Sequence, residues 1–271
     1  MKIQEVIDAL EQFAPLPLQE SYDNAGLQVG LTEADVSGAL LCLDVTEKVI
    51  DKALEMGCNV VIAHHPLLFR GLKRISDADY VQRAVRKAIC HDITIIAMHT
   101  NLDNAFGGVN HKMAQKLGVG NVEFLADVRT VADQYGGKTP ESQMTGGSGV
   151  IGTLPKPMSA KDFISHVKKT FSAKCCMTNE VLQRPVSCVA ICGGAGAFLI
   201  PQALAKGADA FITGEAHYHE FFGMEQQMQI MALGHYESEQ FTVEIFEDIL
   251  KQRCPDVRIV MFGSTNPVRY W

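Results

Sequence analysis

One pattern of strand, helix, glycine and strand occurs twice in this chain and constrains its fold more than any other feature. Ala53–Ala63 aligns with Ala203–Thr213 position by position, with an apolar strand at the end of each copy. Gly57 and Gly207 stand at equivalent places, where the left-handed conformation that ends a helix suits glycine. The pattern therefore predicts an internal duplication of one α/β unit.

Short apolar segments alternate with helical segments over most of the 271 residues. This alternation is typical of largely parallel sheets whose two faces are covered by helices. We therefore expect the α/β class, with two similar α/β domains that contain mixed, largely parallel sheets. The first domain is predicted over residues 1–126, with residues 236–271 packing back on it, and the second over residues 127–235. The glycine-rich residues 127–149 are predicted to be an inserted surface loop.

Histidines stand where three of the apolar strands are expected to end, and two acidic residues stand four positions after a histidine. Ligands bind beyond the carboxyl ends of strands in sheets of this class. Imidazole nitrogens and carboxylate oxygens together suit borderline or hard divalent metals. The sequence thus predicts an open site for one or two metal ions. The candidate ligands are His64, His65, His99, Asp103, His235 and Glu239.

Each of these motifs also has a plain structural explanation. His64 and His65 can be a hydrogen-bonded loop pair, Asp103 can belong to a turn, and Glu239 can stabilise the start of a helix. We favour a metal site because all the motifs are expected at the same edge. Since Pro66 favours an extended His65, we expect the two imidazoles to project to opposite sides and to suit two metals.

Two further segments leave their roles open. The glycine-rich turn Cys192–Ala197 follows a strand and precedes a helix, which suits either close backbone packing, the favoured interpretation, or a contact to phosphate. Glu215, His217 and His219 follow the next strand and are either relics of the repeated ligand pair or contacts to a substrate.

The composition restricts the partners. A net charge of −7 argues against a nucleic-acid-binding surface, whereas the cations Arg70, Lys73 and Arg74 favour a phosphorylated small molecule. Eight cysteines without a CxxC spacing, and an N-terminus without a signal-peptide pattern, indicate a reduced, cytoplasmic protein. No apolar stretch reaches the roughly 18 residues of a membrane span.

Five motifs in order resemble those of a known family, the GTP cyclohydrolase I type 2 homologues, also called Nif-three-like proteins. The motifs cover nearly the whole chain and are Tyr22–Gly30, Ala63–Phe69, His99–Asp103, Thr213–Glu215 and Gly234–Glu239. The resemblance implies two divalent cations per subunit, with Zn, Mn, Fe, Co and Ni all admissible. The ligands that it implies are His64, His65, Asp103, His235 and Glu239. For His99 the resemblance implies either a marginal metal ligand or a residue that contacts the ligands without binding the metal.

The resemblance also implies two similar domains around a cleft, a short form without an inserted domain, and a toroidal homohexamer. Apolar loop residues such as Leu67, Phe69 and Phe222 add weak support for self-association. We expect a metal-dependent hydrolase of a nucleotide or a phosphorylated small molecule. The alternative is a non-catalytic metal-carrying or regulatory scaffold protein. The cyclohydrolase activity rests on the family label alone, so whether the chain is an enzyme stays open.

Overall fold

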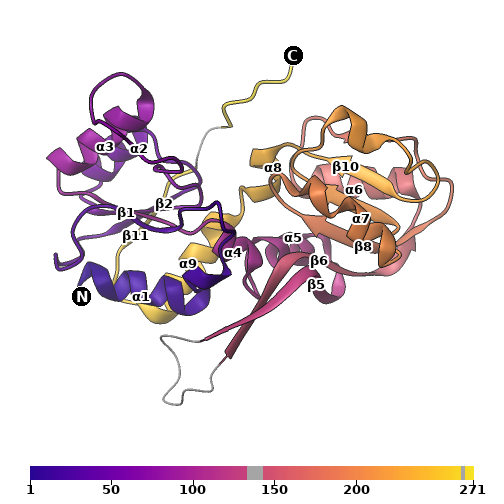
Figure 1. Ribbon diagram of the computed structural model, residues 1–271, viewed down its shortest axis with the longest axis horizontal. Helices are drawn as coiled ribbons and strands as arrows, with labels where there is room; N and C mark the ends of the chain where they lie inside the picture. Colours follow the sequence, from indigo (N-terminus) through magenta and orange to yellow (C-terminus); the bar gives the residue numbers. More distant parts are fainter. Residues whose placement is uncertain (133–142, 264–265) are drawn as a thin grey trace. The chain divides into compact units, whose positions relative to one another are not determined.

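The chain forms two α/β units, each built around its own mixed sheet (Figure 1). This computed structural model describes residues 1–132, 143–263 and 266–271. Unit 1 comprises Met1–Ala105, Val131–Met144 and Thr242–Thr265, and unit 2 comprises Phe106–Thr130, Thr145–Phe241 and Asn266–Trp271. The predicted fold class, α/β with mixed and largely parallel sheets, is confirmed.

Unit 1 contains a five-stranded sheet in the order β1-β4-β3-β2-β11. The strands are β1 (Gly26–Val29), β2 (Ala39–Cys42), β3 (Val60–Ala63), β4 (Thr94–Ala97) and β11 (Ile259–Met261). All neighbours are parallel except β1, which is antiparallel to β4. The carboxyl ends of β2, β3 and β4 therefore meet at one edge of the sheet, because Cys42, Ala63 and Ala97 are paired across it.

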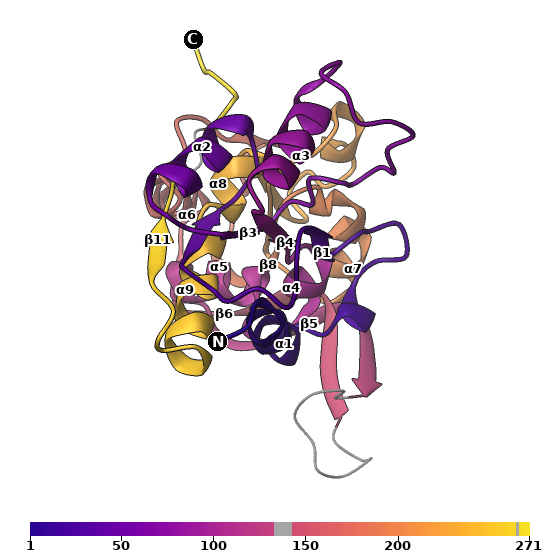
Figure 2. The same ribbon diagram turned by 90° about the vertical axis from the view of Figure 1, so that its left-hand side faces the viewer.

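Helices cover both faces of this sheet. α2 (Glu47–Glu55) and α3 (Tyr80–Cys90) lie on one face, and α1 (Ile3–Phe13) and α9 (Thr242–Arg253) lie on the other (Figure 2). Alternate strand residues, such as Leu40 and Cys42, are buried against α2 and α3. Two short elements complete the unit: η1 (Leu16–Leu18), and α4 (Thr100–Asn104), which follows β4 directly. The strands are thus buried on both faces, as their continuous apolar runs predict.

Unit 2 contains a six-stranded sheet in the order β5-β6-β8-β9-β10-β7. The strands are β5 (Gly120–Ala132), β6 (Gln143–Met158), β7 (Met177–Thr178), β8 (Val186–Cys192), β9 (Ala210–Thr213) and β10 (Gln229–Ala232). The central strands β8, β9 and β10 are parallel, and β6 and β7 flank them in antiparallel orientation.

The residues of β8 divide between two core clusters. Val189 and Ile191 pack on the face covered by α5 (Val109–Leu117) and α6 (Ala160–Thr170), and Ala190 packs on the opposite face. That opposite face is covered by η2 (Gly196–Leu199) and α7 (Ile200–Ala205). Ser159 caps the N-terminus of α6, since its hydroxyl accepts a hydrogen bond from the Asp162 amide. The unit also contains η3 (Tyr218–Phe221) and α8 (His235–Glu239).

The two sheets repeat the same local design. Each has three adjacent parallel strands in chain order, β2-β3-β4 in unit 1 and β8-β9-β10 in unit 2. The side chain of Asn59 accepts a hydrogen bond from the Ser37 amide at 2.9 Å, and Asp209 accepts one from the Ser187 amide at 2.8 Å. These residues occupy equivalent positions in the repeat. The structure therefore supports the internal duplication with a shared side-chain contact as well as with shared strand order.

The described residues correct one expectation of the sequence. Residues 127–132 and 143–149 belong to β5 and β6 and are not surface loop, and residues 133–142 lie outside the described part of the chain. Two glycines of β6 allow this strand to approach β5 closely. A Cβ atom at Gly147 would lie 2.8 Å from the Ala126 carbonyl oxygen, and one at Gly152 would lie 2.6 Å from the Gly120 carbonyl oxygen.

The division between the units also differs from the predicted boundary at residue 126. Residues 106–126 belong to unit 2, because Met113, Ala114 and Leu117 of α5 are buried in the same cluster as Phe163 and Val167 of α6. Residues 242–263 belong to unit 1, where β11 pairs with β2. Within the described residues, no helix has the length and apolar character needed to cross a membrane.

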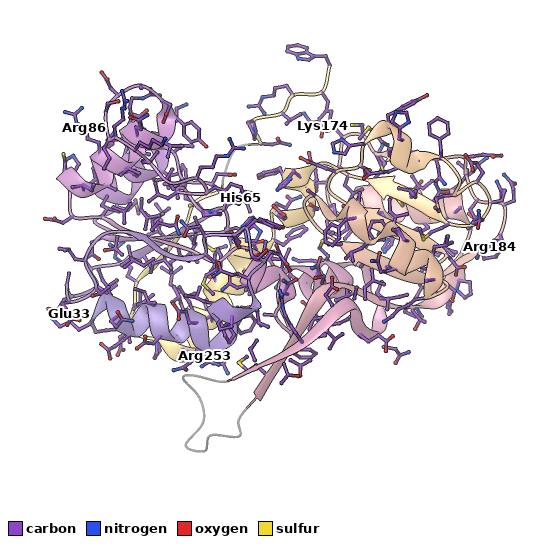
Figure 3. All side chains as sticks on the ribbon, in the orientation of Figure 1. Glu33, His65, Arg86, Lys174, Arg184 and Arg253 are labelled. Atoms are coloured by element: carbon purple, nitrogen blue, oxygen red, sulfur yellow. The ribbon has the colours of Figure 1, made fainter. Side chains whose placement is uncertain are left out.

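Asp209 links β8 and β9 in unit 2 and pairs with Arg184, which Figure 3 labels. Burial raises the pKa of Asp209, but hydrogen bonds from the Cys188 amide, the Arg184 guanidinium and the Ser187 amide outweigh it. The pKa therefore lies below its ordinary value of 3.8. A carboxyl group with a lowered pKa stabilises the fold above its ordinary pKa, and this stabilisation is lost as the pH falls through the folded-state pKa.

We expect Asp209→Ala to lower the free energy of unfolding by about 2 kcal/mol at pH 7, because two backbone amides lose their acceptor. Asp256→Ala, at an exposed position, is the control and should change little. Urea denaturation between pH 7 and pH 2.5 measures both effects. The deficit of Asp209→Ala should shrink as the pH falls below 3.8, and a deficit that stays constant over this range would contradict the assignment.

Candidate metal-binding site

The carboxyl ends of β3 and β4 bring three histidines together in unit 1. β3 ends at Ala63, immediately before His64 and His65, and β4 ends two residues before His99. Because Ala63 and Ala97 are paired in the parallel ladder, both histidine segments leave the sheet at the same edge. Figure 3 shows His65 at this edge, among the ends of the unit 1 strands.

The backbone bends where β3 ends, which corrects the expectation that His64 and His65 project to opposite sides. The amides of both residues donate to the same acceptor, the Leu43 carbonyl oxygen, at 3.2 and 3.0 Å. This shared acceptor interrupts the alternation of an extended strand. The two imidazole rings therefore lie near each other, with centroids 4.9 Å apart.

His64, His65 and His99 form one group in which a ligand atom from each ring lies within 4.8 Å of the others. His64 is fully buried, and the other two side chains are mostly buried. The ring of His99 has centroid distances of 5.3 Å to His64 and 5.6 Å to His65. His99 is thus a full member of the group by position.

Each of these rings has an acceptor at Nδ1, which holds the ring proton on that side. The Nδ1 atoms of His65 and His99 lie 2.7 Å from carboxylate oxygens of Asp44 and Asp23. The Nδ1 atom of His64 lies 2.7 Å from the Met98 carbonyl oxygen. Nε2 is therefore the atom that each ring offers to a metal, and such partners orient histidine ligands in metal sites.

Asp23 is a buried carboxylate behind His99. Burial raises its pKa, but hydrogen bonds from the His99 ring and the Thr100 hydroxyl outweigh it and lower the pKa of Asp23 to about 2. The Thr100 amide also donates to Asp23, at 3.0 Å. Asp23 is therefore ionised at neutral pH, and it fixes both the His99 ring and the first residue of α4.

Asp103 lies on α4, one helical turn after His99. Its amide donates to the His99 carbonyl oxygen at 3.0 Å, and its Oδ1 atom lies 3.6 Å from Nε2 of His64. A carboxylate therefore stands beside the Nε2 atom of His64 within unit 1.

Unit 2 presents a second group on α8. Nε2 of His235 lies 3.1 Å from Oε2 of Glu239, and Nδ1 of His235 lies 3.1 Å from Oε1 of Glu215. The two residues of α8 share one face of the helix because they are four positions apart. Gly234 precedes them with a φ of +111°, a conformation that side chains disfavour. This bend directs His235 toward Glu215 as well as Glu239.

The glycine turn Cys192–Ala197 serves close packing. The amides of Gly193, Gly194 and Gly196 donate to side chains of Asn110, Ser238 and Thr213, so these amides are already engaged within the protein. A Cβ atom at Gly194 would lie 2.4 Å from Oε1 of Glu239. The turn therefore makes room for Glu239, and the packing interpretation is the one that the structure supports.

Asp23 and Asp44, two carboxylates behind the histidines, were not assigned a role from the sequence, and a third, Glu215, was left with two alternative roles. Asp23 lies inside a motif of the family, Asp44 follows the end of β2, and Glu215 aligns with His65 in the repeat. Asp44 and Glu215 could have been found from the sequence, because each follows the end of a parallel strand at the same sheet edge as the histidine that it contacts. The histidines His217 and His219 belong to no metal-capable group among the described residues, and His219 packs against Tyr218.

The residues present fit a metal ion. The unit 1 group offers three imidazoles with anchored Nδ1 atoms and a neighbouring carboxylate. Within unit 2, the α8 group offers an imidazole and a buried carboxylate. These are nitrogen and oxygen donors without sulfur, which suit borderline divalent cations.

The fold and these groups define a class of protein: a two-unit α/β protein with histidine and carboxylate groups that can hold a metal ion. The model of one family, described as Duf34/NIF3 (NGG1p interacting factor 3), matches residues 1–267. The chain belongs to this family.

Relatives of known sequence cover the whole chain. The chain is 31% identical to a GTP cyclohydrolase 1 type 2 homolog from Clostridium perfringens over 96% of each chain. It is 32% identical to the protein of the same name from Streptococcus pneumoniae, with 100% of each chain covered. The family resemblance of the sequence motifs is thereby confirmed.

Two solved structures show the same fold. A protein related to NIF3 from Bacillus cereus matches with a TM-score of 0.86 and 26% identity, over 100% of this chain and 99% of that chain. A hypothetical protein from Staphylococcus aureus matches with a TM-score of 0.88 and 27% identity, over the same shares of the two chains.

Asp44→Ala should weaken metal binding by about 10- to 100-fold, because His65 loses the acceptor that orients its ring. Asp51→Ala is a matched control, since this exposed carboxylate of α2 pairs with Lys87 and not with a histidine. Competition of each variant against a chelator for Zn²⁺ or Mn²⁺ measures the affinities. If the two variants bind the metal with equal affinity, Asp44 does not contribute to the metal-binding site.

Proposed function

We propose that this protein binds two divalent cations per subunit and uses them to hydrolyse a nucleotide or a phosphorylated small molecule. The observation that carries the proposal is the set of histidines whose Nδ1 atoms are all anchored on acceptors. An arrangement of this kind orients several Nε2 atoms for coordination. The proposed ligands are His64, His65, Asp103, His235 and Glu239, a set taken from the repeated sequence pattern and the family resemblance.

The geometry of unit 1 favours His99 as an additional ligand. His99 belongs to the same group as His64 and His65, and its Nδ1 atom lies 2.7 Å from a carboxylate oxygen of Asp23. Among the described residues, the unit 1 group thus holds three imidazoles, whereas the group on α8 holds one. The native metal is one of Zn, Mn, Fe, Co or Ni, all of which accept such donors.

The chemistry of the proposed reaction follows from these donors. Divalent cations supply Lewis acidity and lower the pKa of a coordinated water at neutral pH. The chain's own contribution is to fix the ring orientations through Asp23, Asp44 and Glu215. It also keeps His64 buried and places the acidic side chains Asp103 and Glu239 beside the imidazoles, where they would balance the positive charge.

The names of the relatives, GTP cyclohydrolase 1 type 2 homolog, support a nucleotide as the first substrate class to test. A metal-carrying or regulatory role without turnover is the second candidate, and the anchored donor set is compatible with it as well. Metal content and turnover, measured on the same samples, separate the two candidates.

We also propose a toroidal homohexamer, as the family resemblance implies. Tyr218 and Phe222 are exposed aromatic side chains in unit 2, whereas Leu67 is buried within unit 1 and needs no partner. Light scattering at micromolar concentration should give the mass of six chains. A mass near that of one chain would contradict the assembly.

The central experiment combines metal analysis with a turnover assay on protein purified without added metal. Wild-type protein should contain two cations per chain and hydrolyse at least one member of a nucleotide panel. Glu239→Gln should lower the occupancy of both cations and the turnover together, because it removes an anionic ligand. Glu237→Gln is the control, since Glu237 is equally buried on α8 but bonds to Asn266.

The outcomes distinguish the hypotheses. Retention of both cations by Glu239→Gln would contradict its assignment as a ligand. Full metal content in the wild type, with no turnover of any nucleotide or sugar phosphate in the presence of Zn, Mn, Fe, Co or Ni, would favour the metal-carrying role over the hydrolase.

A further inference from the structure

Unit 1 contains a pocket of about 600 Å³ next to the histidine group. Its wall includes the apolar side chains of Phe69, Leu72 and Ile75 and the polar side chains of Asn24, Lys73 and Arg74. Volumes of this size are typical of small-molecule sites, which combine apolar walls with a few polar groups. The pocket therefore has both the size and the composition of a binding site.

Phe69 joins this pocket to the histidines. Its ring stands edge-on to His99, with ring centroids 6.1 Å apart, and edge-on to Tyr22, with centroids 6.4 Å apart. Phe69 is 45% exposed, so its exposed surface can contact another molecule. A ligand in the pocket would therefore share a wall with the histidine group.

Lys73 and Arg74 supply positive charge that the described part of the protein does not neutralise. Neither side chain makes an ion pair or a hydrogen bond with another described residue. In the same unit, Arg83 pairs with Glu47 at 2.8 Å, and Lys87 pairs with Asp51. Two exposed cations in a pocket wall, without a partner among the described residues, suit an anionic ligand group.

The glycine turn Cys192–Ala197 of unit 2 is not available to bind a phosphate group. Its amides at Gly193, Gly194 and Gly196 already donate to side chains of the protein, at 2.9 to 3.1 Å. A phosphate-binding turn needs amides that point at the ligand. The structure thus removes the sequence's other candidate for a phosphate contact.

We propose that this pocket binds a phosphorylated ring compound of nucleotide size. Lys73 and Arg74 bind the phosphate, and the ring packs against Phe69 beside the histidine group. The inference deepens the proposed function, because it places the phosphate and the ring of the substrate in unit 1. The assignment of the bound compound as a substrate rests on that proposed function. Binding itself needs only the pocket, so it can be measured without metal.

The test is calorimetric titration of the full chain, treated with a chelator, with GMP, AMP, guanosine and inorganic phosphate. The double variant Lys73→Ala/Arg74→Ala should bind the nucleotides at least about tenfold more weakly, since each charged contact contributes a large part of the affinity. Lys48→Ala/Arg86→Ala carries the same change of charge and should bind like the wild type. Figure 3 shows Arg86 in unit 1 well apart from His65.

A second pair of variants tests the ring contact. Phe69→Leu should weaken nucleotide binding about fivefold or more, because stacking on an aromatic side chain stabilises a bound base. Phe198→Leu alters a comparably exposed phenylalanine outside the pocket and should have no effect. Circular dichroism of all four variants checks that each is folded.

Three results would overturn the proposal: no nucleotide binding by the wild type, equal weakening by the two double variants, or inorganic phosphate binding as tightly as GMP. Metal content is measured separately on untreated protein. Loss of metal sites with intact nucleotide binding would contradict the proposed function alone, whereas intact metal sites without nucleotide binding would contradict the pocket alone.

Discussion

The hydrogen bonds at the Nδ1 atoms of four histidines are the interactions on which the two candidate metal-binding groups, one in each unit, depend. Asp23, Asp44 and Glu215 hold the rings of His99, His65 and His235, and a backbone carbonyl oxygen holds His64. An imidazole without such a partner would rotate and could place its proton on either nitrogen. With the partner present, each ring offers Nε2 in a fixed direction, which is the condition for coordinating a metal.

The duplicated scaffold explains where these partners stand and why the two copies differ. In the alignment of the repeats, Glu215 of unit 2 occupies the position of His65 in unit 1. In unit 1 that position offers a nitrogen donor, whereas in unit 2 it anchors His235. The shared position lies at the end of the second parallel strand in each sheet. One scaffold position thus has two chemical roles.

Glycines in unit 2 allow close packing and a sharp turn that residues with a side chain would hinder. Gly194 leaves the space that Glu239 occupies, and Gly234 turns the backbone between β10 and α8. In β6, Gly147 and Gly152 allow close contact with β5. The glycines of residues 143–149 therefore indicate close strand packing, although the sequence favoured a surface loop there, whereas the turn at Cys192–Ala197 packs closely as expected.

The sequence by itself determined the α/β class, the duplication, and the residues that gather at each sheet edge, because apolar periodicity fixes the strands and parallel strands end together. It could not determine the bend at His64 and His65, which arises when two successive amides share the Leu43 carbonyl oxygen. Nor could it assign Asp23 to His99, since these residues are far apart in the chain and meet only when β1 pairs with β4. The local sequence pattern determines the strands and helices, whereas contacts between side chains distant in sequence depend on how the strands pack in the sheet.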